Sequence, residues 1–165
     1  MKILFRITFL LLSCIALAQP KPEMTPSGFA PIEFTTPNRP TEKLIEVAKS
    51  WAPYYNKKGF DVYDVTENSL KIDGFRTNAY FYRSLGETYS YNIKYTLAVV
   101  FNADKTYTVT FALKESYAKE ALVKTTVADF FTPDGKLKDD FIEVKPSLER
   151  TAETIIKSFT NFIQN

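Results

Sequence analysis

The most regular hydrophobic pattern in the chain lies in residues 91–114, YNIKYTLAVVFNADKTYTVTFALK. Apolar side chains occupy every second position on both sides of a turn at Asn102–Lys105, and mostly polar side chains, many of them threonine, fill the positions between. A period of two is typical of strands with one buried face. Residues 91–101 and 106–113 are therefore predicted to form an antiparallel hairpin with one buried face and one mostly polar face.

Two other segments repeat their apolar residues at helical spacing. The first is residues 41–55, TEKLIEVAKSWAPYY, where Thr41 is expected to cap the helix and Pro53 to end or kink it. The second follows Pro146–Ser147 and predicts a helix of about four turns. Its apolar stripe is made by Leu148, Ala152, Ile155, Ile156, Phe159, Phe162 and Ile163.

The remaining segments are shorter or less regular. Alternation and turn residues predict strands at residues 30–36, 60–65, 70–75 and 79–83. In residues 115–145 the pattern is weaker: KTTVADFF (124–131) favours another strand, and Pro133–Gly135 favours a turn. Residues 19–29 contain three prolines and no periodicity, so they are predicted to be an extended linker.

This order of elements predicts the fold class. A strand, a helix, several antiparallel strands and a final helix follow one another along the chain. Because each helix and each strand has one apolar face, the two kinds of element are expected to cover each other. Residues 30–165 are therefore predicted to form a single α+β domain. Its architecture is a two-layer sandwich of order β-α-β-β-β-β-α, with a long C-terminal helix on an antiparallel sheet.

The N-terminus has the features of an export signal. Lys2 and Arg6 precede an apolar run that is too short for the ~20 residues of a membrane span. Ala16-Leu17-Ala18 then fits the small residues that signal peptidase requires, which predicts a signal peptide at residues 1–18 and a mature chain that begins at Gln19. The alternative is lipidation of Cys14, which would tether the protein to a membrane. The predicted location is therefore periplasmic or secreted, with a lipoprotein as the alternative.

Composition narrows the possible functions. Loss of residues 1–18 removes two of the 21 basic residues and none of the 19 acidic ones, which leaves a net charge of zero. A neutral chain lacks the basic surface that nucleic-acid binding demands, so no nucleic-acid partner is expected. The chain has no histidine, and its one cysteine lies in the predicted signal peptide. Histidine- or cysteine-based nucleophilic catalysis and zinc sites are therefore excluded, and no cofactor is predicted.

Several segments together resemble a known family. They are the leader ending in Ala-Gln, the first strand before a helix containing AKSW, and the segments DVTENSLKIDG, YNIKYTLAVVFNADKTYTVTF and ERTAETIIKSFTNFI. In these features residues 30–164 resemble an exported Bacteroidota family of unknown function (DUF4468-like), described as having a TATA-binding-protein-like (TBP-like) fold. The resemblance implies a strongly bent antiparallel sheet with the C-terminal helix on its concave face. It implies no activity and no site residues.

Aromatic residues provide the candidate ligand or partner surface. Tyr80, Tyr82, Tyr89 and Tyr91 lie close together in the sequence and could line a pocket for an apolar or sugar ligand. The alternative is that they alternate between the core and the edges of the sheet, because aromatic residues are common in strands. Trp51 and Tyr55 on the first helix present the same choice, and Trp51 is most simply explained as a core anchor.

Acidic residues provide a second set of candidates. Asp61 with Asp64, or Asp139–Asp140 with Glu143, could supply the two carboxylates of a glycosidase. The alternative is that these acids, which lie among lysines, are solvated surface charge.

Three functional hypotheses follow. The leading one is an exported, non-catalytic domain that binds another envelope protein or a surface component. The second is a carrier that holds a small apolar ligand between the sheet and the C-terminal helix. The third is a carboxylate-dependent hydrolase of envelope glycans.

Overall fold

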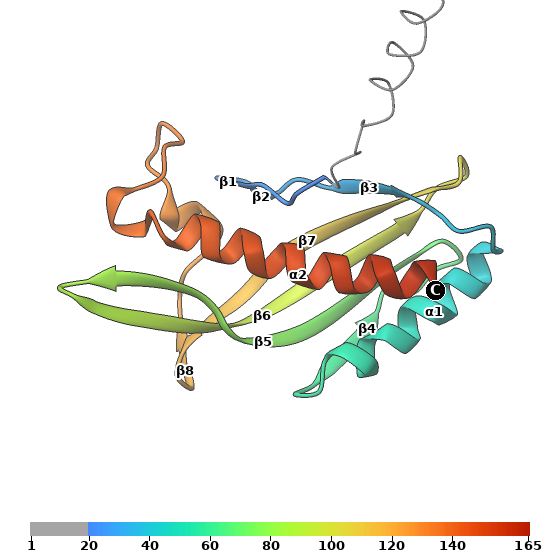
Figure 1. The fold of residues 1–165 in the computed structure, drawn as a ribbon, viewed down its shortest axis with the longest axis horizontal. Helices are drawn as coiled ribbons and strands as arrows, with labels where there is room; N and C mark the ends of the chain where they lie inside the picture. The colour runs from blue at the N-terminus through green and yellow to red at the C-terminus, as the bar shows by residue number, and fades with distance from the viewer. Residues whose placement is uncertain (1–19) are drawn as a thin grey trace, which may run out of the picture.

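The computed structural model describes residues 20–165, which form an antiparallel sheet, a small two-stranded hairpin and two α-helices (Figure 1). The predicted signal peptide, Cys14 and the cleavage site Ala18–Gln19 lie outside the described residues. The elements in chain order are β1 (Met24–Thr25), β2 (Gly28–Phe29), β3 (Ile32–Thr35), α1 (Thr41–Tyr55), β4 (Phe60–Tyr63), β5 (Ser69–Ser84), β6 (Glu87–Phe101), β7 (Thr106–Ala118), β8 (Ala121–Val123), the 3-10 helices η1 (Val127–Phe130) and η2 (Asp139–Phe141), and α2 (Val144–Gln164).

The six-stranded sheet has the order β3-β7-β6-β5-β4, and all of its pairings are antiparallel. One edge of β7 pairs with β6, and two short strands share the other edge. There β3 pairs with residues 106–109, and β8, the sixth strand, pairs with residues 116–118. The helix α2 crosses in front of β5, β6 and β7 (Figure 1). The predicted two-layer α+β sandwich is therefore confirmed.

The predicted hairpin is confirmed and is longer than expected at both open ends. One extra residue, Lys114, enters β7 between the partners of Lys94 and Tyr95, as in a β-bulge. Before the bulge, the odd-numbered residues of β7 point toward the helices. After the bulge, the even-numbered residues do, so Ser116 is buried. The residues that are buried as predicted are Ile93, Tyr95, Leu97, Val99, Phe101, Tyr107, Val109 and Phe111.

The two strands predicted at residues 70–75 and 79–83 are one strand, β5. Its pairing with β6 is regular up to Arg76 and resumes at Tyr80, so a register shift replaces the expected break. Sixteen residues at about 3.3 Å each make β5 about 50 Å long. This length carries the β5–β6 hairpin beyond the rest of the sheet, where it projects at the left of Figure 1.

The C-terminal helix α2 begins at Val144, before the predicted start, and spans 21 residues. Pro146 is tolerated because it lies in the first turn, where a backbone N–H has no partner within the helix. The predicted apolar stripe faces the sheet, and all of its members are buried except Phe162, which is partly buried. The stripe therefore closes the core from one side.

The first helix, α1, packs beside α2 and against β4 and β5. Thr41 is its first helical residue and not its cap; Pro40 holds the capping position, and no side chain caps the helix there. Pro53 lies within the last turn, and the helix ends two residues later at Tyr55. The prediction for Thr41 was therefore wrong by one position, whereas Pro53 does lie next to the end of the helix.

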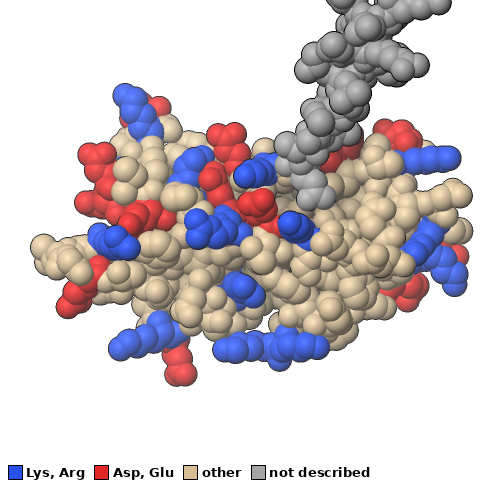
Figure 2. Space-filling model, in the orientation of Figure 1, with Lys and Arg blue, Asp and Glu red and all other residues tan. Residues whose placement is uncertain are grey.

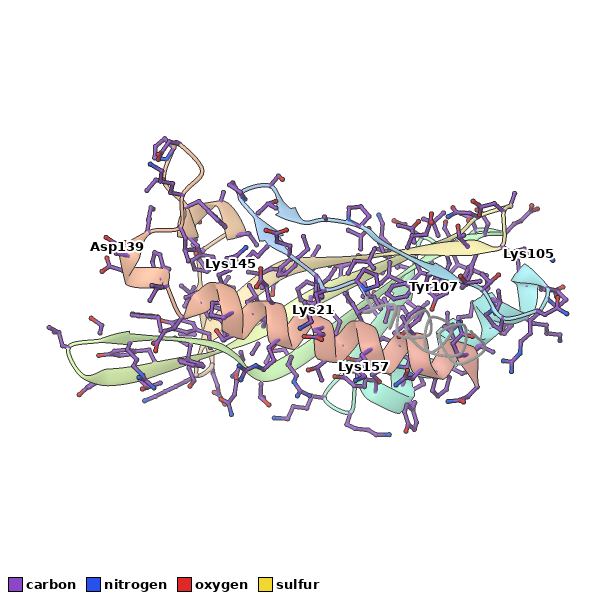
Figure 3. All side chains as sticks on the ribbon, turned by 45° about the horizontal axis from the view of Figure 1, so that its top comes forward. Lys21, Lys105, Tyr107, Asp139, Lys145 and Lys157 are labelled. Atoms are coloured by element: carbon purple, nitrogen blue, oxygen red, sulfur yellow. The ribbon has the colours of Figure 1, made fainter. Side chains whose placement is uncertain are left out.

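Part of the predicted linker is folded. Residues 24–29 form the β1–β2 hairpin, and both Met24 and Phe29 are buried. Met24 is bound to α2, because its N–H donates to Glu149 Oε1 at 2.8 Å and its carbonyl accepts from Lys145 Nζ at 2.7 Å. Figure 3 shows Lys145 near the start of α2. The expectation of an extended linker was wrong for this segment because local periodicity does not reveal a pairing that long-range contacts stabilise.

The segment between β8 and α2 also differs from the prediction. Residues 124–131 form no strand; they contain η1, which starts with a reciprocal pair of hydrogen bonds between Thr126 and Asp129. The predicted turn at Pro133–Gly135 is present, with Gly135 at a positive φ of 80°. Phe130 and Phe131 are buried, which explains why this segment had the apolar character of a strand.

Positive and negative side chains are interspersed over the helix-bearing face, with large uncharged areas between them (Figure 2). Within residues 20–165, no helix is both long enough and apolar enough to cross a membrane.

Candidate functional site: a tyrosine ladder on the β5–β6 hairpin

The six aromatic residues singled out in the sequence form two separate groups. Tyr80, Tyr82, Tyr89 and Tyr91 come together on β5 and β6 and are called here the tyrosine ladder. Trp51 and Tyr55 lie on α1 and belong to a second group, the Trp51 cluster, with Phe159 of α2 and Tyr107 of β7. The structure therefore unites four of the predicted residues and separates the other two from them.

The ladder is a continuous row of stacked rings. The rings of Tyr80 and Tyr91 are nearly parallel, with centroids 4.9 Å apart and an angle of 4° between their planes. Tyr82 stacks on Tyr91 at 5.8 Å and on Tyr89 at 5.3 Å. Stacked pairs at these separations are favourable beyond the area that they bury. The row is therefore a rigid aromatic surface along the hairpin.

Strand register places these rings together. Tyr80 lies directly opposite Tyr91 in the β5–β6 pairing, and Tyr82 lies directly opposite Tyr89. Directly opposed side chains project from the same face of a sheet, and so do residues two apart on one strand. The hairpin closes through Leu85 and Gly86, whose positive φ angles of 51° and 81° suit the tight two-residue turn between Ser84 and Glu87.

Exposure rises along the ladder from its base to its tip. Tyr80 at the base is 3% exposed, and Tyr89 near the tip is 40% exposed. Leu85 in the turn is fully exposed. The ladder is thus part of the core at Tyr80 and is exposed to solvent at Tyr89.

Two phenylalanines of the 3-10 helices complete the site. Phe130 of η1 meets Tyr80 edge-on at 5.8 Å, and Phe141 of η2 meets Tyr82 edge-on at 6.0 Å. A hollow of about 190 Å³ lies between these rings, Tyr91, Val123 and Thr125. Sequence reasoning missed both phenylalanines because they are distant from the ladder along the chain; the apolar pair at Phe130–Phe131 was the one available signal.

Three tyrosines of the ladder, Tyr80, Tyr89 and Tyr91, resist ionisation. Burial, together with the neighbouring Tyr82, raises the pKa of Tyr91 to about 12. Burial also raises the pKa of Tyr80. At the exposed end, the hydrogen bond that Tyr89 donates to Glu87 at 2.9 Å raises the pKa of Tyr89. These three phenols therefore stay neutral and can donate hydrogen bonds at any physiological pH.

The Trp51 cluster has a different character. Trp51 is completely buried, stacks on Tyr55 at 4.9 Å and meets Phe159 edge-on at 5.2 Å. Its indole N–H donates to Ser158 Oγ at 3.2 Å. Tyr55 is partly buried, and burial raises the pKa of its phenol. Trp51 is thus a core anchor that joins both helices, and it presents no surface to a ligand.

Two acids of the predicted carboxylate pairs are engaged by basic side chains. Asp64 accepts a hydrogen bond from Lys71 at 2.8 Å, and Glu143 pairs with Arg83 at 3.5 Å. Asp139 and Asp140 lie in η2, and Figure 3 places Asp139 at the end of the molecule opposite Lys105. Asp61 lies directly across from Asp73 in the β4–β5 pairing.

Sequence reasoning also missed Asp73, although its position in the strand pattern LKIDGF was a signal. The Asp73 carboxylate is 6% exposed and accepts hydrogen bonds from Tyr63 Oη at 3.1 Å, Thr96 Oγ1 at 2.6 Å and Lys114 Nζ. Burial raises the pKa of Asp73, but the three hydrogen bonds outweigh burial and hold the pKa below its ordinary value. Asp73 is therefore an ionised, fully bonded carboxylate.

Solved structures provide the comparison with known proteins. No family model and no curated protein sequence matches the chain. A TBP-like protein from Parabacteroides distasonis superposes with a TM-score of 0.54 at 11% identity, over 82% of this chain and 92% of that one. A DUF4468 family protein from Bacteroides ovatus gives 0.52 at 13% identity, over 81% and 80%. At these identities the likeness concerns the fold alone, and it confirms the fold that the sequence resemblance predicted: the chain has the TBP-like fold of these two bacterial proteins.

Proposed function

We propose that the protein is an exported, non-catalytic binding domain that contacts an envelope protein or a surface component through the tyrosine ladder. The observation that carries this proposal is the gradient along the ladder: four stacked rings run from the core to solvent on a hairpin that projects from the sheet (Figure 1). The rigid base holds the exposed rings in place before a partner arrives, which lowers the entropic cost of binding.

The chemistry of the hairpin suits recognition. Tyrosine offers a large apolar ring and a hydroxyl donor, and it is enriched where protein interfaces concentrate their binding energy. The turn adds Leu85, a fully exposed apolar residue at a left-handed position where asparagine or glycine is usual. An apolar tip next to exposed tyrosine supports contact with a macromolecular partner.

The acidic residues favour binding over hydrolysis. A glycosidase needs one carboxyl group that is protonated at the working pH and a second that is free to attack or to activate water. Asp73 is held ionised by three donors, and Asp64 and Glu143 are engaged by lysine and arginine. None of these three carboxylates is free for either role, which supports the binding proposal over a carboxylate-dependent hydrolase.

The carrier hypothesis has one observation in its favour, at a different place from the one predicted. The interface between α2 and the sheet is filled by buried side chains such as Leu148, Ile155 and Phe159. The hollow of about 190 Å³ beside the ladder is smaller than the ~300–1,000 Å³ of most small-molecule sites. It suits only a small apolar group, so the carrier stands as the second candidate function.

Site-specific photo-crosslinking in the native host tests the proposal. A photoreactive phenylalanine analogue replaces Tyr89 in one variant and Tyr54 in a matched control, because Tyr54 is another exposed tyrosine but lies on α1. We expect one discrete crosslinked product from position 89 and none from position 54. Equal products from both positions, or none from position 89, would contradict a role for the ladder.

The mass of the protein recovered from the same cells tests export. A polypeptide that begins at Gln19 agrees with the proposal, and a lipidated Cys14 would place the protein on a membrane. A full-length chain that keeps Met1 would contradict export. Native mass spectrometry of the same sample separates the functional candidates, because a small stoichiometric adduct would favour the carrier.

A further inference from the structure

The sheet carries a second hollow on the face opposite the helices. Its volume is about 490 Å³, within the range of small-molecule sites. Asp73, Phe75 and Lys94 line it and alternate along their strands with residues that face the helices, which places them on the open face. The remaining lining comes from Gly74, from Lys114 at the bulge, from Tyr117, and from residues 58–61 at the start of β4 and in the turn before it.

The floor of this hollow is a fixed ion pair. Asp73 is buried and bonded to Lys114, and the Lys114 ammonium also lies 5.5 Å from the centre of the Tyr63 ring. The β-bulge places Lys114 here, because it adds one residue to β7 at the level of Lys94 and Tyr95. Asp73 and Lys114 neutralise each other, so the charge that a ligand would meet comes from the other residues of the lining.

Two lysines of the lining are available for a ligand. Lys58 forms no ion pair with any residue in the described range 20–165. Lys94 forms one long ion pair, with Glu115 Oε1 at 3.9 Å, and the other oxygen of Glu115 accepts a hydrogen bond from Tyr117. The one acid of the lining outside the floor is Asp61. The residues that line the hollow include three lysines and two aspartates, so the lining has a net charge of +1, which the neighbouring Glu115 partly offsets.

Aromatic rings form one wall of the hollow. Phe75 and Tyr117 lie with ring centroids 5.9 Å apart and an angle of 57° between their planes. Both are partly exposed, and Phe60 adds a third ring that is about half exposed. Flat apolar surface beside the ammonium groups of Lys58 and Lys94 is complementary to a ring that carries an anionic group.

We propose that this hollow binds a small carboxylate with an attached ring. The carboxylate pairs with Lys94 and Lys58, and the ring lies against Phe75 and Tyr117. The site is independent of the tyrosine ladder, which lies on the other face of the sheet, so either proposal can fail while the other stands.

Phenylacetate is the probe, and 2-phenylacetamide, which has the same ring and no charge, is its matched control. Titration of the isotope-labelled protein, followed by amide chemical shifts, is expected to move the signals of Gly74, Lys94 and Tyr117 with a Kd of about 0.1–5 mM. Phenylacetamide is expected to bind at least about fivefold more weakly, and added salt to weaken phenylacetate alone.

Variants assign the contacts. Lys94→Gln and Lys58→Gln are each expected to weaken phenylacetate binding roughly five- to tenfold, which corresponds to the loss of one charged contact. The control is Lys157→Gln, because Lys157 lies on α2, which covers the other face of the sheet (Figure 3). This substitution is expected to leave the Kd unchanged. Asp61→Asn is expected to tighten binding, because it removes the opposing charge. Equal affinity for the two probes, shifts that map to another surface, or no shifts at millimolar probe would each overturn the proposal.

Discussion

The Trp51 cluster and the tyrosine ladder are built from similar aromatic residues on the same side of one sheet, yet one is sealed and the other reaches solvent. The reason is the length of the elements. The 21 residues of α2 span about 31 Å at 1.5 Å per residue, whereas β5 is about 50 Å long. Because the helix is shorter than the strand, α2 covers Trp51 but leaves the end of the β5–β6 hairpin uncovered.

The comparison teaches that similar aromatic patterns can serve stability in one place and recognition in another. At the Trp51 cluster, both helices and the sheet supply partners on every side. Along the ladder, the rings that pack edge-on come from the short segments η1 and η2, and Tyr89 is 40% exposed. Substitutions in the two groups should therefore separate loss of stability from loss of binding.

The largest expected effect is that of Trp51→Ala. Removing a completely buried indole leaves a cavity between the helices and the sheet, so the free energy of unfolding should fall by about 3–5 kcal/mol. Urea denaturation followed by circular dichroism measures this loss. A loss below about 1 kcal/mol would contradict the role of Trp51 as a core anchor.

Gly74→Ala is the next largest. A Cβ atom at this position would lie 2.6 Å from the Tyr95 hydroxyl and even closer to Asn56 Oδ1. Tyr95 donates to that oxygen at 2.6 Å, and both side chains are buried, so neither can move away without breaking the bond. We expect a loss of about 1–3 kcal/mol in the same urea experiment.

A smaller effect is expected at alkaline pH. Tyr91 has a folded-state pKa of about 12, against an ordinary value of 10.0, so the unfolded chain loses this proton first. The resulting stability is fully present below pH 10 and is lost as the pH rises through 12. The urea midpoint should therefore fall less between about pH 9 and about pH 11 in Tyr91→Phe than in the wild type. The same fall in both proteins would show that Tyr91 does not contribute.

The smallest effect on stability is expected for Tyr89→Ala. Its ring is substantially exposed, so the free energy of unfolding should change by less than about 1 kcal/mol. Binding of the partner identified by crosslinking should weaken at least about tenfold, since exposed tyrosines often carry binding energy. Unchanged affinity with unchanged stability would remove the ladder from the binding surface and leave the two aromatic groups functionally alike.

The sequence by itself determined the elements whose pattern is local and strong. The alternation in residues 91–113 and the apolar stripe of the C-terminal helix predicted the central hairpin, the covering helix and the two-layer α+β class. Trp51 was also correctly interpreted as a core anchor. These predictions succeed because a buried face imposes its period on neighbouring residues of the same element.

Only the tertiary structure decided the features that depend on contacts between distant residues. The folding of residues 24–29 depends on Lys145 and Glu149, more than a hundred positions away. The register shift in β5 places the tyrosine ladder, and the bulge at Lys114 places the Asp73–Lys114 pair. Neither irregularity produces a periodic pattern in the sequence around it. The relative lengths of β5 and α2 decide which aromatic rings remain exposed, because burial depends on the element that lies across a residue and not on the residue itself.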